Sequence, residues 1–292
     1  MRLSLRDHEL AFEPGRPVLM GIVNAGPDSF SDPGPRRLDG LLNQAGGMVA
    51  AGASLIDVGG ESGRTDRPPV SEDEEASRVV PLIERLSGEG VVVSVDTWRA
   101  GPARSALDAG AALVNDASAL SDPALADLCA ATGAGLVITH TRTAPKTKGI
   151  PGHADVVADA AALLGELMAT AAEKGVAEDA VLLDPGLDLG KTPAESVEIL
   201  RRVGELEHLG RPLLFAISRK DFLGAITGRS PAARDPATLA AVEPALDLLG
   251  TVLRVHDVAG AADFLAVRVA LRGEPSAPDA ALAERLRTEA VA

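Results

Sequence analysis

Apolar residues gather along the chain in short runs of strand length. The runs span 17–23, 54–58, 91–95, 111–114, 135–138, 180–183, 212–217 and 251–255. Most of them are uninterrupted rather than alternating, which is typical of strands buried on both faces of a parallel sheet. We therefore expect eight buried parallel strands.

Stretches with helical spacing of apolar residues separate these runs. The longest are 38–51, 72–86, 154–172, 194–209 and 238–249. Strand and helix thus alternate about eight times without a linker, which predicts an α/β fold, a (β/α)8 TIM barrel. The alternative is an open doubly wound sheet, but Asn24-Ala25-Gly26-Pro27-Asp28 lacks the glycines of a dinucleotide fingerprint.

The N-terminal segment has its own pattern. Alternation at Leu3, Leu5, Leu10 and Phe12 predicts a short strand pair within 1–15. We expect residues 1–292 to form a single domain, with 275–292 as a C-terminal tail. No apolar stretch approaches the roughly 18 residues of a membrane span, and we expect a soluble, cytoplasmic protein that binds no membrane.

Composition narrows the classes of partner. With 28 Lys and Arg against 42 Asp and Glu, the net charge is −14, which argues against a nucleic-acid partner. Cys129 is the sole cysteine, so neither an internal disulfide nor a cysteine zinc site is available. His8, His153 and His208 are expected at the surface, and the acids at 72–75 in a solvated first helical turn.

Nearly every apolar run is followed by polar residues. They are Asn24, Asp57, Asp96, Asn115, Asp116, His140, Asp184, Ser218, Arg219, Lys220, Arg254, His256 and Asp257. In a barrel these positions meet at the face that carries active sites. Each carboxylate or amide alone could instead cap a helix, and Arg254 could pair with Asp257, but capping does not require Lys220, Arg254 and His256 as well.

The mixture of side chains suggests two ligand chemistries. Asp96, Asn115, Asp184 and Lys220 offer donors and acceptors for a flat heterocycle with amino, N–H and keto groups. Arg254 and His256 are two residues apart and can present positive charge and an imidazole N–H to phosphate or pyrophosphate. The amide oxygen of Asn24 could ligate a phosphate-bound Mg²⁺.

These motifs resemble those of the dihydropteroate synthase family over about 17–267. The matching stretches are Met20-Gly21-Ile22-Val23-Asn24, Pro27-Asp28-Ser29-Phe30, Asp57-Val58-Gly59-Gly60-Glu61-Ser62, Ser94-Val95-Asp96-Thr97, Asn115-Asp116, Leu183-Asp184-Pro185-Gly186, Ser218-Arg219-Lys220 and Arg254-Val255-His256-Asp257. The resemblance implies a pterin-binding barrel that condenses 6-hydroxymethyl-7,8-dihydropterin pyrophosphate with p-aminobenzoate. It also implies a homodimer, for which the helices within 259–271 could supply the contact.

By position, the resemblance assigns roles to particular residues. Asp96, Asn115, Asp184 and Lys220 correspond to the pterin pocket, and Asn24, Arg254 and His256 to the pyrophosphate and Mg²⁺ subsite. Ser218 and Arg219, beside Lys220, are expected to contact substrate. Asp28 and Phe30 fall in a first mobile loop and Ser62 and Arg64 in a second, and the two loops build the p-aminobenzoate site. We expect Asp96, Asp184, Lys220 and Asp28 to carry the chemistry.

The chain departs from the family pattern in both loops. Gly26 stands where the family has Thr, and Ser62-Gly63-Arg64-Thr65-Asp66 replaces Ser-Thr-Arg-Pro-Gly. Such glycines raise the entropic cost of closing a loop. Two alternatives follow: a divergent paralogue with another amine acceptor, weak activity or sulfonamide tolerance, or a pterin-binding barrel that is non-catalytic or of the methyltransferase type.

Overall fold

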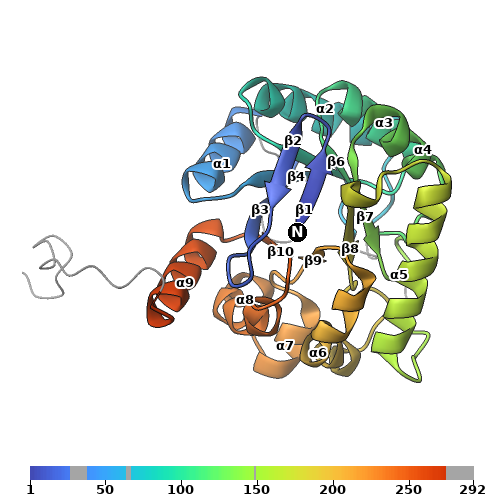
Figure 1. The fold of residues 1–292 in the computed structure, drawn as a ribbon. Helices are drawn as coiled ribbons and strands as arrows, with labels where there is room; N and C mark the ends of the chain where they lie inside the picture. Colours follow the sequence, from blue (N-terminus) through green and yellow to red (C-terminus); the bar gives the residue numbers. More distant parts are fainter. Residues whose placement is uncertain (27–37, 64–66, 148, 274–292) are drawn as a thin grey trace, which may run out of the picture.

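The computed structural model describes residues 1–26, 38–63, 67–147 and 149–273. Eight parallel strands close into a barrel in the order β10-β3-β4-β5-β6-β7-β8-β9, with helices around it (Figure 1). The expected TIM barrel is therefore confirmed. The barrel strands are β3 (Val18–Asn24), β4 (Leu55–Gly59), β5 (Val93–Asp96), β6 (Leu113–Asp116), β7 (Gly135–Thr139), β8 (Val181–Asp184), β9 (Leu213–Phe215) and β10 (Thr251–Val255).

Helices follow the strands as the alternating pattern predicts. They are α1 (Leu38–Ala50), α2 (Glu72–Gly88), α3 (Ala100–Asp108), α4 (Ala124–Thr132), α5 (Val156–Glu173), α6 (Pro193–Arg201), α7 (Asp221–Thr227), α8 (Asp235–Val242) and α9 (Val258–Leu271). Two expected helices are shorter than predicted. After α6 the chain continues as the 3₁₀ segment η2 (Val203–Leu209), and after α8 as η4 (Glu243–Ala245), where Pro244 removes a backbone donor. Two further 3₁₀ turns are η1 (Glu178–Ala180) and η3 (Pro231–Ala233).

The predicted N-terminal strand pair is present and closes one end of the barrel. β1 (Arg2–Leu5) pairs antiparallel with β2 (His8–Ala11), across the barrel end in Figure 1. Leu3 and Leu5 are fully buried in the interior cluster with Met20, Leu55 and Leu182. Their burial leaves the opposite end, where the strands finish, as the face available for a site.

A second and larger apolar cluster lies between the strands and the surrounding helices. Residues of β4 and β7 alternate between the two clusters, so both faces of each strand are buried. Because both faces are buried, the strands appear in the sequence as uninterrupted apolar runs. Within the described residues, no helix has the length and apolar character needed to cross a membrane.

Candidate active site

A layer of polar side chains lies directly above the apolar interior of the barrel. Side chains two residues apart on a strand point the same way. Four interior residues, Leu55, Leu113, Leu182 and Val252, are each followed two positions later by a polar residue. These polar residues are Asp57, Asn115, Asp184 and Arg254, respectively. The same alternation turns their side chains into the barrel mouth.

Strand register brings further residues to this level. Asn24 is paired with Gly59, Gly59 with Asp96, and Asp96 with Asn115 across four neighbouring strands. Gly59 lies between Asn24 and Asp96, because a Cβ on this glycine would be 3.7 Å from Asn24 Oδ1 and 3.8 Å from Asp96 Oδ2. We call the following set the polar ring: Asn24, Asp57, Asp96, Asn115, Asp184, Lys220, Arg254 and His256.

Arg254 joins two carboxylates across the ring. Its Nε donates to Asp57 Oδ2 at 2.5 Å and its Nη2 to Asp96 Oδ2 at 2.6 Å. Arg254 thus pairs with these two acids rather than with Asp257. Burial disfavours its charge, but Asp57 and Asp96 outweigh this effect and hold the pKa of Arg254 above its usual range. Nη1 makes no hydrogen bond with the described residues and remains able to donate to an anion.

Asp184 and Asn115 each retain an acceptor that no described residue uses. Asp184 Oδ1 accepts from the Gly186 backbone N–H at 2.7 Å, and Asn115 Nδ2 donates to Asp57 Oδ2 at 3.0 Å. Asp184 Oδ2 and Asn115 Oδ1 have no hydrogen bond within the described part of the chain. Both side chains are almost completely buried, so a ligand N–H would gain a contact shielded from water.

Burial also sets the ionisation of the ring carboxyls. Desolvation raises the pKa of Asp184, and the Gly186 N–H and the charge of Lys220 partly offset the rise. Desolvation likewise raises the pKa of Asp96, against the lowering effect of Arg254. A desolvated carboxylate becomes more stable when a positive charge approaches it.

The turn after β9 positions Lys220. Arg219 adopts a left-handed φ of +60°, and its guanidinium binds Asp235 through Nε at 2.7 Å and Nη2 at 2.8 Å. This pair fixes the strained turn, and Lys220 then forms the N-cap position of α7. The Lys220 side chain makes no hydrogen bond with described residues, yet its charge acts on both Asp96 and Asp184.

His256 is supported by Ser218. Ser218 Oγ lies 2.9 Å from His256 Nδ1 and also accepts from the His256 backbone N–H at 3.2 Å. Burial and the charges of Arg219 and Arg254 lower the pKa of His256 to about 3, so the ring is neutral near pH 7. Ser218 therefore supports His256, and Arg219 supports the turn that carries Lys220.

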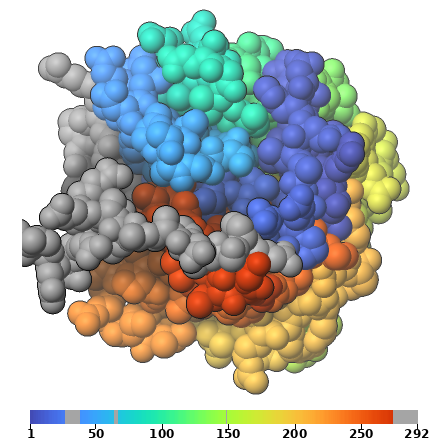
Figure 2. All heavy atoms as spheres, turned by 60° about the vertical axis from the view of Figure 1, so that its left-hand side comes forward, coloured from blue at the N-terminus to red at the C-terminus, as the bar shows by residue number. Residues whose placement is uncertain are grey.

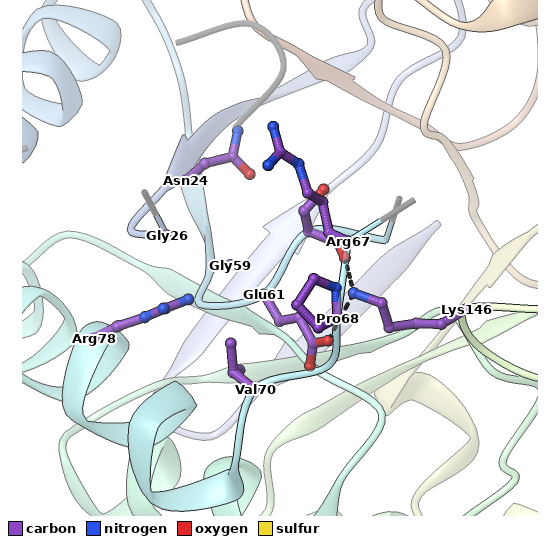
Figure 3. Close-up of a pocket in the computed structure, with 10 residues that line it drawn as sticks. Asn24, Gly26, Gly59, Glu61, Arg67, Pro68, Val70, Arg78 and Lys146 are labelled. Atoms are coloured by element: carbon purple, nitrogen blue, oxygen red, sulfur yellow. Dashed lines mark hydrogen bonds and ion pairs between the residues drawn. The ribbon is translucent and has the colours of Figure 1, made fainter. Parts of the chain in front are cut away.

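Beside the ring, an open hollow of about 340 Å³ lies between the ends of β3 and β4 and the segment before α2 (Figure 3). Its lining includes Asn24, Ser62, Arg67 and Lys146. The Asn24 side chain makes no hydrogen bond with described residues. Ser62 belongs to the expected site and lies here, whereas Asp28, Phe30 and Arg64 fall outside the described residues.

A buried ion cluster fixes the backbone that forms one wall of this hollow. Arg99 donates to Glu61 Oε2 at 2.5 Å and to Glu75 Oε2 at 2.7 Å, and Lys146 Nζ lies 2.8 Å from Glu61 Oε1. The expectation that all acids at 72–75 are solvated is wrong for Glu75, whose side chain is 1% exposed. Desolvation raises the pKa of this carboxyl, while Thr97 and Arg99 lower it.

Two residues that support the polar ring were not among the expected site residues. Asp57 was noted as a polar strand end, but its pairing with Arg254 joins positions 197 residues apart and leaves no local signal. Lys191 is 4% exposed and donates to the carbonyls of His140, Gly186 and Leu189. It fixes the loop behind Asp184, where Gly186 has a φ of +69° and a Cβ would overlap the His140 carbonyl oxygen.

We expect Lys191→Met to lower the free energy of unfolding by about 2–4 kcal/mol, because three carbonyls, two of them buried, would lose a charged donor. Urea denaturation measures this change. Lys174→Met is the matched control, since Lys174 forms an exposed pair with Asp127 that is worth about 0–1 kcal/mol. Equal losses in the two variants would show that Lys191 does not hold the loop.

Comparison with known proteins places this geometry in a family. Residues 20–256 match the model of the pterin binding enzyme family. The dihydropteroate synthase of Bacillus subtilis is 40% identical over 244 residues, which cover 82% of this chain and 84% of that protein. A probable bifunctional folylpolyglutamate synthase/dihydropteroate synthase of Haloferax volcanii is 40% identical over 87% of this chain, which spans only 30% of that longer protein.

The fold agrees with these sequence matches. The structure of Xanthomonas albilineans dihydropteroate synthase in complex with 7,8-dihydropteroate superposes with a TM-score of 0.83 at 35% identity, covering 95% of this chain and all of that one. The family match over residues 20–256 spans the positions of the polar ring, from Asn24 to His256. The chain therefore belongs to the pterin binding enzyme family and, within it, to the dihydropteroate synthases.

Proposed function

We propose that this chain joins 6-hydroxymethyl-7,8-dihydropterin pyrophosphate to p-aminobenzoate at the polar ring, releasing pyrophosphate. One observation carries the proposal. Arg254 bridges Asp57 and Asp96 and has one nitrogen that no described residue binds, at the same barrel mouth as the acceptors of Asp184 and Asn115 that no described residue uses. An anion subsite and a heterocycle subsite therefore lie together in one layer.

The pterin is assigned to Asp184, Asn115 and Lys220. Asp184 Oδ2 would accept from adjacent N–H groups of the ring, a charge-assisted contact that neutral acceptors do not match. Asn115 Oδ1 would accept a further N–H, and Lys220 Nζ would donate to a keto oxygen or ring nitrogen. Asp96 would lie beside the carbon that bears the leaving group and stabilise positive charge there.

The pyrophosphate is assigned to Arg254 and His256. Arg254 Nη1 would donate to a phosphate oxygen while its other nitrogens remain on Asp57 and Asp96. The neutral imidazole of His256, held by Ser218, would supply an N–H donor. When the C–O bond breaks first, the electron pair leaves with pyrophosphate. The pterin cation is then held near Asp96 and Asp184 until the amine forms the new C–N bond and loses its proton.

The residues present fit a Mg²⁺ ion at Asn24. Its amide oxygen has no hydrogen bond with described residues and faces the space beside Asp96. Mg²⁺ commonly takes one or two protein oxygens and fills its other positions with phosphate oxygens and water. A bound Mg²⁺ would neutralise developing charge on the leaving pyrophosphate.

The p-aminobenzoate is assigned to the hollow beside the ring, with Ser62, Arg64, Asp28 and Phe30 as contributors. The described lining supports this with Ser62 and with cationic side chains suited to a carboxylate (Figure 3). Arg219 lies beside Lys220 and is bound to Asp235. Asp28, outside the described residues, keeps its expected part in the chemistry.

Gly63→Thr should lower the apparent KM for p-aminobenzoate by about 2–5-fold. Replacing glycine lowers the conformational-entropy cost of ordering the loop by about 0.4–1 kcal/mol. A Cβ at Gly63 meets nothing within 4 Å, so the described residues accommodate it. Steady-state kinetics with varied p-aminobenzoate measure the effect, and Gly204→Thr, at an equally open position, is the control. An unchanged KM would show that Gly63 does not limit loop closure.

Product analysis tests the proposed reaction. The full chain, Mg²⁺ and both substrates are expected to yield dihydropteroate, detected by mass spectrometry. A panel of other aryl amines separates the alternatives. Turnover only with another amine would indicate the divergent paralogue, and pterin binding without any product would indicate a binding protein.

We further propose a single-domain homodimer in the cytoplasm. α9 lies at the surface (red in Figure 2) and exposes Val267 at 60% and Leu271 at 84%. Exposed apolar side chains on one helix favour a contact between copies. Residues 1–15 belong to the same domain, because the hairpin packs into the barrel interior, and 275–292 are assigned to the tail. Limited proteolysis tests the domain, and cell fractionation tests the location.

Leu271→Glu is expected to convert the dimer to a monomer, because a charge in an apolar interface is costly to desolvate. Light scattering after size exclusion measures the mass directly. Ile226→Glu is the control, since Ile226 is 65% exposed on α7, away from α9. A monomeric wild type, or a dimer that survives Leu271→Glu, would contradict this assignment.

A further inference from the structure

Outside the polar ring, two histidines and an aspartate converge on one point between β7, α5 and α6. His140 follows β7, His153 precedes α5, and Asp159 lies in its first turns. Within the described residues, their ligand atoms all lie within 4.8 Å of one another. His153 was expected at the surface, but its side chain is only 5% exposed; His8 and His208 are exposed as predicted.

The nitrogen atoms of this cluster are incompletely satisfied. His140 Nε2 lies 2.8 Å from Asp159 Oδ2, while His153 Nε2 lies 3.6 Å from the same oxygen. That distance is too long for a hydrogen bond. Among the residues that the structure describes, His153 Nε2 is buried without a hydrogen-bond partner, and so is His140 Nδ1. An orphaned buried nitrogen costs free energy unless something occupies the space before it.

The second nitrogen of His153 is already oriented for metal binding. Nδ1 lies 2.8 Å from Glu195 Oε1, which also accepts from the His153 backbone N–H at 3.0 Å. The opposite oxygen of Glu195 is held by Thr192 in a capping box at the start of α6. A carboxylate that takes Nδ1–H leaves the Nε2 lone pair for a metal, the arrangement that orients histidine ligands in zinc sites.

We propose that His140 Nε2, His153 Nε2 and Asp159 Oδ2 form a binding site for a divalent transition metal of the Zn²⁺ class. The site is separate from the Mg²⁺ position at Asn24. Two imidazoles and one carboxylate suit Zn²⁺ far better than Mg²⁺, which prefers oxygen ligands. A water would complete the tetrahedron.

The two distances to Asp159 Oδ2 require only small movements, and the two histidine ligand atoms lie within 4.8 Å of each other. Tetrahedral ligands at about 2.0–2.1 Å from zinc lie roughly 3.3 Å apart. The 2.8 Å contact would widen and the 3.6 Å contact would shorten, each by less than about 0.6 Å. The metal would take the place of the proton between His140 Nε2 and Asp159 Oδ2. The His140 ring would then carry its proton on Nδ1. Asp159 Oδ1 would keep its 2.9 Å bond from Arg142 Nη2.

The neighbouring charges limit the affinity of the site. Arg142 binds both oxygens of Asp159, and Lys191 Nζ donates to the His140 carbonyl at 2.9 Å. These two cations repel a divalent ion, whereas Asp159 and Glu195 attract it. The metal would connect the end of β7 to the segment before α5 and, through Glu195, to α6, so its role is structural.

The test uses the full chain, freed of metal by a chelator and then titrated with Zn²⁺ in a calorimeter and with Co²⁺ in a visible spectrometer. Excess Mg²⁺ is present throughout to fill hard-cation sites. One equivalent of each metal is expected to bind, and Co²⁺ should give the intense visible bands of four-coordinate geometry. Failure to saturate at one equivalent, or a six-coordinate Co²⁺ spectrum, would overturn the site.

Variants locate the binding. His153→Gln and Asp159→Asn should each weaken Zn²⁺ binding by at least about 100-fold, and Glu195→Gln by about 10–100-fold because it only orients His153. His208→Gln replaces an exposed histidine and should bind Zn²⁺ as the wild type does. Circular dichroism verifies that each variant is folded. If His153→Gln and His208→Gln bind equally, the metal lies elsewhere and the proposal is wrong.

Discussion

Asp184→Asn is expected to lower the affinity for the pterin substrate by about 10²–10³-fold, the largest effect of any single replacement in the ring. No described residue uses Asp184 Oδ2 as an acceptor, the residue is 4% exposed, and Oδ1 already accepts from the Gly186 backbone N–H. The amide keeps one neutral acceptor and can turn an NH₂ toward the N–H groups of the ligand. Loss of two charge-assisted hydrogen bonds costs about 3–4 kcal/mol, which corresponds to that range.

Calorimetry with 6-hydroxymethyl-7,8-dihydropterin measures this change without any dependence on turnover. Asp179→Asn is the matched control, because Asp179 binds Ser4 at the closed end of the barrel. The control should bind the pterin with wild-type affinity. Undiminished binding by Asp184→Asn would remove Asp184 from the site.

Arg254→Lys should weaken binding of the pyrophosphate ester by at least about 10²-fold more than binding of the bare hydroxymethylpterin. Lys keeps the positive charge but cannot reach two carboxylates and an anion at once, since a guanidinium presents three nitrogens in a fixed plane. Its single ammonium group would remain between Asp57, which is fully buried, and Asp96. The anion would then lose its donor.

Arg254→Ala would add a second effect. It would leave two buried carboxylates without their partner, at a cost of about 3–5 kcal/mol in stability. Arg254→Lys is therefore the variant for binding, and urea denaturation of both variants separates folding from recognition. Equal affinity losses for the ester and the bare pterin would contradict the role of Arg254 at the pyrophosphate.

The barrel was predictable because its strands are buried on both faces, so each one forms an apolar run in the sequence. α3, α4 and α7 were not delimited from the sequence, since each has only seven to nine residues and thus few turns to show a period. The 3₁₀ continuations after α6 and α8 depend on tertiary packing and local proline, not on the apolar period alone.

The convergence of polar strand ends at one face was predictable, but the contacts among them were less so. Polar residues at strand ends had to meet at one face, which brought Asp96, Asn115, Asp184 and Arg254 together. Their pairing could not be derived, because contacts such as Arg254 with Asp57 and Arg99 with Glu61 join distant segments. The burial of His153 has the same origin: its partner Glu195 is 42 residues away.

Pyrophosphate release, followed with and without p-aminobenzoate, tests the central proposal most directly. The purified chain receives dihydropterin pyrophosphate and Mg²⁺, and the amine is then added at saturation. If the polar ring and the adjoining hollow act as one site, sustained release occurs only after the amine is present and matches dihydropteroate formation mole for mole. Release at the same rate without the amine, or none with it, would contradict the proposal.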